Sequence, residues 1–320
     1  MKDKRLRIVF MGTPEFAVES LRALVEGGYQ VVGVVAAPDK PVGKHHSVLQ
    51  ACPVKEYAVS QGLPVLQPEK LRDAEFLEQL KAWNADLQIV VAFRMLPEVV
   101  WNMPPLGTFN LHASLLPQYR GAAPINWAII NGEKETGITT FFLTHEIDTG
   151  KVIYRERIPI ADTDTFETVH DRLMYLGAQG VLKTVDAIAG NTVQPLAQEL
   201  LTENEHVLKP APKIFRETCR IDWNQSVKEI YDFIRGLSPF PAAWTELNAG
   251  NGETLHLKIF AGEKIIRPHE LPAGSIVTDG KTCLDVTATD GFIRLKEIQQ
   301  AGKKRMTVDA FLRGFKGAHG

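Results

Sequence analysis

Apolar runs and stretches with helical periodicity alternate along the first half of the chain. The runs at 6–11, 30–37 and 87–92 are short and nearly uninterrupted, which is typical of strands buried on both faces of a parallel sheet. Between the first two runs, apolar residues such as Leu21 and Leu24 recur at helical spacing. The alternation predicts βαβ units and hence a mostly parallel sheet with helices on both faces.

The pattern changes in the second half. A long helix is predicted from a capping box at Asp164 to Ile188, and the segment 194–212 that follows carries three prolines and little periodicity. After it, short β-type runs are separated by Gly and Pro, as in a small barrel of the OB type. We therefore expect an α/β protein in which a Rossmann-like, mostly parallel sheet domain (1–193) is joined by a linker (194–212) to an OB-like β-barrel domain (213–320).

The composition narrows the class of protein. A chain of 320 residues with 44% hydrophobic and 23% charged residues is ordinary for a globular protein of two domains. No apolar run is long enough to cross a membrane, and three scattered cysteines without CxxC spacing indicate a reducing compartment and no metal site. We therefore expect a cytoplasmic protein without a membrane segment.

The charge gives a weaker indication. A net charge of −2 argues against a general nucleic-acid binder. Basic residues nevertheless outnumber acidic ones from Val207 to the end of the chain. A surface that faces a polyanion and a chance asymmetry explain this excess equally well.

Asn110 and His112 are the first candidates for chemistry. They stand at the end of a short predicted strand, 108–111. Residues two apart in a strand project to the same side, and ligands of open parallel sheets bind outside the carboxyl ends of the strands. An amide donor beside an imidazole suits acyl transfer. A lone histidine such as His112 is more often structural than catalytic.

Asp148 supplies an acid. It lies in a turn between two late predicted strands, 138–143 and 152–158. Turns rich in Asp, Thr and Gly usually serve only backbone geometry. An acid is, however, the partner that His112 lacks, so we interpret Asp148 as the third member of a site.

With these residues in view, the chain resembles the folate-dependent formyltransferases, and among them those that act on methionyl-tRNA. The resemblance is carried by the run NLHASLLPQYRGAAPINWAIINGEKETGITTFFLTHEIDTG, by the start RIVFMGTPEFAV and by the later segments PAPKIF, IRGLSPFPAAW and GKKRMTVDAFLRG. It implies a Rossmann-like catalytic domain followed by an OB-like domain. The implied activity is transfer of the formyl group of 10-formyltetrahydrofolate to the amino group of initiator methionyl-tRNA in translation initiation.

The resemblance also assigns residues. It implies that Asn110, His112 and Asp148 are catalytic and that the co-substrate binds without a metal. The implied folate-binding residues are two short segments, in one of which Phe93-Arg94 replaces the family's frequent Tyr-Gly: Phe93, Arg94, Met95 and Leu96, and Ser114, Leu115, Leu116 and Pro117.

The implied tRNA contacts are basic. One group lies in the loop 38–46, which is less basic than is usual in the family, and the other lies near the end of the chain: Lys40 and Lys44, and Lys303, Lys304 and Arg305. We expect a monomer whose partners are initiator methionyl-tRNA and folate.

Other functions are weighed against this one. A related folate-dependent formyltransferase or a formyltetrahydrofolate hydrolase, acting on a small amine or on water, would keep the same three residues. A nicotinamide dehydrogenase would need GxGxxG spacing, which the segment 12–15 lacks. A non-enzymatic RNA-binding protein would not need His112, so the activity of a His112→Ala variant separates that hypothesis from the enzymes.

Overall fold

The computed structural model describes residues 5–42, 48–201, 207–250 and 252–315. These residues form two compact units. Unit 1 takes its described residues from three ranges: 1–121, 136–158 and 170–210. Unit 2 takes the others: 122–135, 159–169 and 211–320. Two early segments of the chain thus belong to unit 2, whereas the domain limits expected from the sequence run without interruption and stay a prediction.

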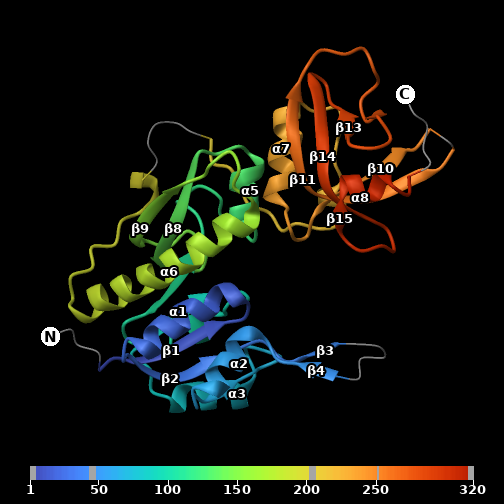
Figure 1. Cartoon of the computed structure of the whole chain (residues 1–320). Helices are drawn as coiled ribbons and strands as arrows, with labels where there is room; N and C mark the ends of the chain where they lie inside the picture. Colours follow the sequence, from blue (N-terminus) through green and yellow to red (C-terminus); the bar gives the residue numbers. More distant parts are fainter. Residues whose placement is uncertain (1–4, 43–47, 202–206, 251, 316–320) are drawn as a thin grey trace. The chain divides into compact units, whose positions relative to one another are not determined.

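Unit 1 is built on a seven-stranded sheet (Figure 1). Neighbouring strands are parallel from β5 to β7, and β8 is antiparallel to β7. Nearly uninterrupted apolar sequence in β1 and β6 matches strands that are buried almost throughout. In sheet order the strands are β5 (Val65–Leu66), β2 (Gln30–Val35), β1 (Arg7–Gly12), β6 (Leu87–Val91), β7 (Thr108–His112), β8 (Glu135–Phe142) and β9 (Val152–Pro159).

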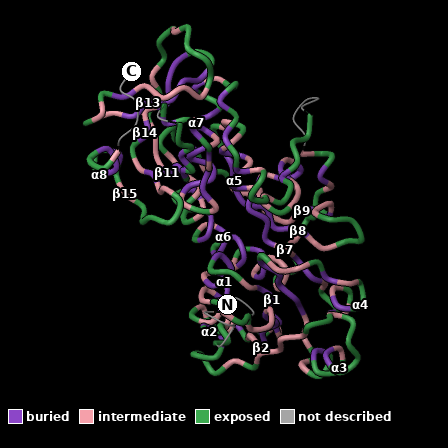
Figure 2. The backbone as a smooth tube through the Cα atoms, turned by 90° about the vertical axis from the view of Figure 1, so that its right-hand side faces the viewer, coloured by how far each residue is buried: buried purple, intermediate pink, exposed green. Residues whose placement is uncertain are grey.

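Helices pack against this sheet, and buried segments lie along the strands and the neighbouring helices, for example at β1 and α6 (Figure 2). The longest helix, α6, lies close to β7 and β8 because it carries glycines there. A Cβ atom on Gly177 would lie 2.7 Å from Leu111, and one on Gly180 would lie 2.6 Å from Ile138. The helices that lie wholly or mostly in unit 1 are α1 (Glu15–Glu26), α2 (Pro53–Ser60), α3 (Ala74–Ala82), α4 (Glu98–Trp101), α6 (Phe166–Ala189) and the 3₁₀ turn η2 (Gln198–Leu201).

The start of α6 differs from the expected capping box. Asp164 instead accepts a hydrogen bond from the backbone N–H of Ala161. Thr165 and Thr168 exchange side-chain to backbone hydrogen bonds of 3.0 and 3.4 Å, so two threonines satisfy the first turn. The expected loop 38–46 also contains a structure that we did not predict, since β3 (Lys40–Val42) pairs with β4 (Val48–Gln50).

Unit 2 holds a six-stranded sheet whose neighbouring strands run antiparallel. Helix α7 packs its apolar face, including Ile230 and Ile234, into a core shared with this sheet. A capping box between Ser226 and Glu229 starts α7. The elements of unit 2 are α5 (Pro124–Ile130), η3 (Glu217–Cys219), α7 (Val227–Gly236), β10 (Ala243–Asn248), β11 (Thr254–Ile266), β12 (Ile276–Thr278), β13 (Leu284–Thr287), β14 (Gly291–Gln300), β15 (Met306–Thr307) and α8 (Val308–Leu312).

The predicted fold class is confirmed: a parallel-rich α/β sheet is followed by a separate antiparallel half-barrel. In the part of the chain that the structure describes, no helix combines the length and the apolar character needed to cross a bilayer.

Candidate active site

Strand β7 delivers two of the predicted site residues. It lies between β6 and β8, with Asn110 opposite Val90 and Phe141. Leu111 packs toward Gly177 of α6, so Asn110 and His112 project from the other face of the sheet. Asn110 is half-buried, and 7% of His112 is exposed. The expected placement of these two side chains on one side of the strand therefore follows from the observed fold.

One nitrogen of His112 is already occupied. His112 Nε2 lies 2.8 Å from the carbonyl oxygen of Tyr119. A carbonyl oxygen only accepts hydrogen bonds, so Nε2 carries a hydrogen and donates it. The other ring nitrogen, Nδ1, lies 3.9 Å from Asp148 Oδ2. Nδ1 is therefore the atom at which the imidazole gains or loses its second proton.

Asp148 is positioned by the connection between β8 and β9. Its φ angle is +55°, in the left-handed region that Asp tolerates better than most residues. Its carboxylate Oδ2 accepts a hydrogen bond of 3.0 Å from the backbone N–H of Gly121. The side chain is 11% exposed, so the carboxylate lies largely inside the protein beside His112.

The loop after β7 is held from several sides. Ser114 Oγ donates to the carbonyl of Gln118, and Thr139 Oγ1 donates to the carbonyl of Ser114 while accepting from the N–H of Leu116. Ser114 and Leu116 are completely buried, and Leu115 is half-buried. Leu116 belongs to a small apolar cluster with Phe141. Strand β8 thus holds this loop through the hydroxyl of Thr139 and the side chain of Phe141.

The second predicted folate segment follows β6, the parallel neighbour of β7. Two such strands end at one edge of the sheet, so the segments after them are brought to the same edge. Met95 is 71% exposed there, while Leu96 is buried. Arg94 donates to the backbone carbonyls of Pro68 and Glu69, and burial lowers the pKa of its guanidinium. The Arg94 side chain therefore braces a neighbouring turn.

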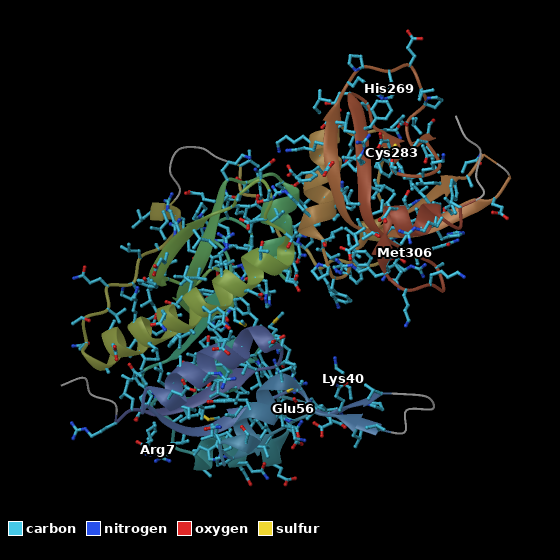
Figure 3. All side chains as sticks on the ribbon, viewed as in Figure 1. Arg7, Lys40, Glu56, His269, Cys283 and Met306 are labelled. Carbon is cyan, nitrogen blue, oxygen red and sulfur yellow. The ribbon has the colours of Figure 1, made fainter. Side chains whose placement is uncertain are left out.

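The predicted tRNA-contact residues lie in separate units. Lys40 is exposed at the start of the β3–β4 hairpin of unit 1 (Figure 3), and Lys44 lies outside the described residues. Lys303 and Lys304 are exposed between β14 and β15 of unit 2. The nearby Arg305 forms two hydrogen bonds of 2.7 Å with Glu297, so its guanidinium is partly committed within unit 2.

Several residues that shape the site had no signal in the sequence. Tyr119 and Gly121 act through backbone groups, which any residue type supplies. Gln198 lies in the segment that we interpreted as a linker, yet it is 1% exposed and hydrogen-bonds the turn of Asp148. A polar residue in a proline-flanked, aperiodic segment carries no pattern that would mark it as buried.

The site contains no described metal-binding cluster. Over residues 5–42, 48–201, 207–250 and 252–315, no three His, Cys, Asp or Glu side chains are grouped so as to hold an ion. The side chains described above are able to donate hydrogen bonds to a developing oxyanion and to accept or release a proton. Both are steps of acyl transfer.

Two family models divide the chain between them. Formyl transferase matches residues 6–185, and Formyl transferase, C-terminal domain, matches residues 213–316. These two matches show that the chain belongs to the class of formyl transferases.

Individual relatives narrow this class. The methionyl-tRNA formyltransferase of Parabacteroides distasonis is 66% identical over 99% of this chain and 98% of its own, and that of Phocaeicola vulgatus is 67% identical with the same coverage. The methionyl-tRNA formyltransferase of Porphyromonas gingivalis is 50% identical over 98% of this chain and 97% of its own. This chain belongs to the methionyl-tRNA formyltransferase family.

Solved structures of lower identity share the fold. HypX from Aquifex aeolicus, solved in complex with tetrahydrofolic acid, matches with a TM-score of 0.64 at 17% identity, over 97% of this chain. This chain spans about half of HypX, 47% of its length. WlaRD, a sugar 3N-formyl transferase solved in the presence of dTDP and 5-N-formyl-THF, matches with a TM-score of 0.63 at 18% identity, over 93% of this chain and 99% of its own.

Proposed function

We propose that this protein transfers the formyl group of 10-formyltetrahydrofolate to the amino group of initiator methionyl-tRNA, with Asn110, His112 and Asp148 as catalytic residues. The observation that carries the proposal is the approach of His112 Nδ1 to Asp148 Oδ2, at 3.9 Å, beside Asn110 on the same strand. It occurs in a chain that is at least 50% identical over nearly its full length to three methionyl-tRNA formyltransferases.

The chemistry begins with attack of the amine on the formyl carbon. A carbon–nitrogen bond forms to the amino group, and the former carbonyl oxygen becomes negatively charged. Asn110 Nδ2 and the Nδ1–H of protonated His112 donate hydrogen bonds to that oxygen. Loss of one such donor typically reduces the rate by about 10² to 10³.

Collapse of the intermediate completes the transfer. The bond between the formyl carbon and N10 of the folate breaks, and N10 takes up a proton. The amine has lost one proton, so the two changes balance. Protonated His112 releases its Nδ1 proton to N10 as this bond breaks. Nδ1 then takes up the proton that the amine has lost, so the imidazolium is regenerated, while Nε2 stays hydrogen-bonded to the carbonyl of Tyr119. The Asp148 carboxylate faces Nδ1 and stabilises the imidazolium while it exists.

The formyl donor binds at the sheet edge where the segments 93–96 and 114–117 meet. Ser114 and Leu116 are completely buried, so they support the loop, and backbone groups with half-buried Leu115 contact the donor. Exposed Met95 supplies an adaptable apolar surface for a planar ring. The co-substrate is 10-formyltetrahydrofolate, and no metal takes part.

The tRNA is bound by basic and aromatic surface of both units. Unit 2 carries a groove of about 930 Å³ whose lining includes Lys213, Arg216, Lys258 and Trp244. The guanidinium of Arg216 lies 5.7 Å from the ring of Trp244. Cations beside aromatic faces suit phosphate contact and base stacking. The turn with Lys303, Lys304 and Arg305 and the hairpin with Lys40 and Lys44 add further contacts.

A competition among amines tests the proposed function. The protein is mixed with 10-formyltetrahydrofolate and, in separate reactions, with methionyl-tRNA, free methionine or a dTDP-linked amino sugar. We expect formylated methionyl-tRNA and an equal amount of tetrahydrofolate. Release of formate without an amide product, or formylation of the sugar alone, overturns the proposal.

A paired substitution connects this activity with the site. His112→Ala is expected to abolish it, whereas His170→Ala, which removes the imidazole beside Asp171 on α6, leaves it unchanged. We further propose that the protein acts as a monomer in the cytoplasm.

A further inference from the structure

Gln198 joins the two segments that meet at Asp148. Its side chain is almost completely buried, at 1% exposure. Its Nε2 donates hydrogen bonds of 2.7 Å to the carbonyl of Asp148 and 2.9 Å to the carbonyl of Gly150. Its Oε1 accepts two hydrogen bonds from Arg120, of 2.7 Å from Nη2 and 3.1 Å from Nε. The amide group is therefore fully used within the site.

The hydrogen bond between the N–H of Gly121 and the Asp148 carboxylate depends on this amide from both sides. The N–H that holds the carboxylate belongs to Gly121, the residue after Arg120. On the other side, Gln198 holds the backbone of Asp148 itself. One side chain thus fixes the hydrogen-bond donor and the acceptor relative to each other.

The turn needs such a support. Residues 144–147, which precede Asp148, are exposed, and Ile147 is 59% exposed. Asp148 has a left-handed backbone conformation, which L-residues rarely adopt. An exposed turn with a strained residue does not hold a carboxylate in place unless other parts of the protein restrain it.

We propose that Gln198 is a positioning residue, which acts through Asp148 to keep its carboxylate facing His112 Nδ1. This inference rests on the proposed function, in which Asp148 supports proton transfer. Misplacement of a catalytic group by about 1 Å lowers turnover by about 10²-fold. The partner of Gln198, Arg120, serves the same purpose from the other side of the amide.

Glutamate is the informative replacement. Gln198→Glu keeps the shape of the side chain and the contact with Arg120, but it has no N–H to donate to the two carbonyls. Gln194, four residues earlier, is exposed, so Gln194→Glu introduces the same charge in the same segment without touching the turn.

The experiment measures kcat and KM for both substrates. We expect Gln198→Glu to lower kcat by about 10- to 100-fold, with KM for the formyl donor and for methionyl-tRNA changed by less than about twofold. Gln194→Glu is expected to keep wild-type kcat. Equal kcat values for the two variants overturn the proposal, and so does a Gln198→Glu defect confined to KM.

A double-mutant cycle with Asp148→Asn separates positioning from a general loss of structure. If Gln198 acts only through Asp148, Gln198→Glu causes no further loss in the Asp148→Asn background. Multiplication of the two defects there shows that Gln198 has another role and overturns the proposal. Absence of methionyl-tRNA formylation by the wild-type protein would instead contradict the proposed function, so the two failures are distinguishable.

A second substitution guards against a folding defect. Arg120→Lys keeps the positive charge but loses the paired donors that hold Gln198 Oε1. It is expected to lower kcat in the same way, with no further effect in the Asp148→Asn background. Wild-type kcat in folded Arg120→Lys protein would contradict the proposal that Arg120 and Gln198 together position Asp148.

Discussion

A Cβ atom on Gly150 would lie 1.6 Å from the carbonyl oxygen of Phe142. No side chain fits at this distance, so any substitution moves the backbone of the turn that carries Asp148. The absence of a side chain at Gly150 is therefore a requirement of the site as well as of the fold.

We predict that Gly150→Ala lowers kcat by about 10²-fold through displacement of Asp148, and that it destabilises the protein by about 1–3 kcal/mol. Gly314→Ala is the control, because the nearest atom to a Cβ there, the carbonyl of Phe311, is 3.9 Å away. Steady-state kinetics and thermal unfolding report the two effects. Wild-type turnover of folded Gly150→Ala would contradict the predicted displacement.

Replacement of Asp148 by Asn tests the charge alone. The side-chain oxygen of Asn still accepts from the N–H of Gly121, which keeps the turn in place, but no negative charge faces His112. We expect kcat to fall by about 10² to 10⁴ with the KM for the formyl donor nearly unchanged.

The matched control for this substitution is Asp171→Asn. Asp171 pairs with His170 at 3.0 Å on the surface of α6, so the same chemical change is made at a second His–Asp pair. Unchanged turnover of Asp148→Asn would remove Asp148 from the mechanism.

Thr139 links strand β8 to the predicted folate loop. Thr139→Val removes the hydroxyl that bonds Ser114 and Leu116, and it leaves a buried carbonyl and a buried N–H without that partner. We expect a loss of about 1–3 kcal/mol in stability and a raised KM for the formyl donor.

The next residue provides the comparison. Thr140 is equally buried, but its hydroxyl bonds Thr184. Thr140→Val should also reduce stability, while the KM for the formyl donor stays at its wild-type value. If both variants raise this KM alike, the effect is one of general stability.

Asp39 gives the protein a specific acid sensitivity. Hydrogen bonds from Lys55 Nζ, at 2.6 Å, and from Gln67 Nε2, at 2.8 Å, lower the pKa of Asp39. A lowered folded-state pKa contributes stability above the unfolded value of about 3.9, and this contribution is lost as the pH falls through the folded-state value. We expect the urea midpoint of Lys55→Met to fall less than that of the wild type when the pH is lowered below about 4.

A substitution that removes the same charge at another position checks this prediction. Lys81→Met removes one positive charge from an exposed position on α3. It should leave the difference between the urea midpoints at neutral and acid pH close to that of the wild type. Parallel curves for wild type and Lys55→Met would exclude Asp39 as a source of the acid sensitivity.

Lys303 and Lys304 test the tRNA contact of unit 2. Each phosphate contact that is lost lowers the slope of log affinity against log salt by about one. We expect the Lys303→Ala, Lys304→Ala double variant to raise the KM for methionyl-tRNA and to flatten this slope, with the KM for the formyl donor unchanged. Lys281→Ala, at another exposed position of unit 2, is the control. Equal salt slopes for the double variant and the wild type would exclude Lys303 and Lys304 as contacts of tRNA phosphates.

Local patterns predicted the elements that support the site. The apolar runs placed β1 and β6 correctly, and helical periodicity over 164–188 predicted α6, because both signals arise from burial of one face or of both. The β3–β4 hairpin was missed, since its strands are three residues long and mostly exposed. A short exposed strand has no hydrophobic face from which to be predicted.

The shared side of Asn110 and His112 was determined by the sequence, because strand geometry alternates side chains over two residues whatever surrounds the strand. The pairing of Nδ1 with Asp148, the fixed Nε2–H and the brace through Gln198 were decided only by the tertiary structure. These contacts join the end of a strand, an exposed turn and a segment beyond α6, and they depend on backbone carbonyls and N–H groups that every residue type carries. Such groups leave no trace in the order of side chains until folding brings the three segments together.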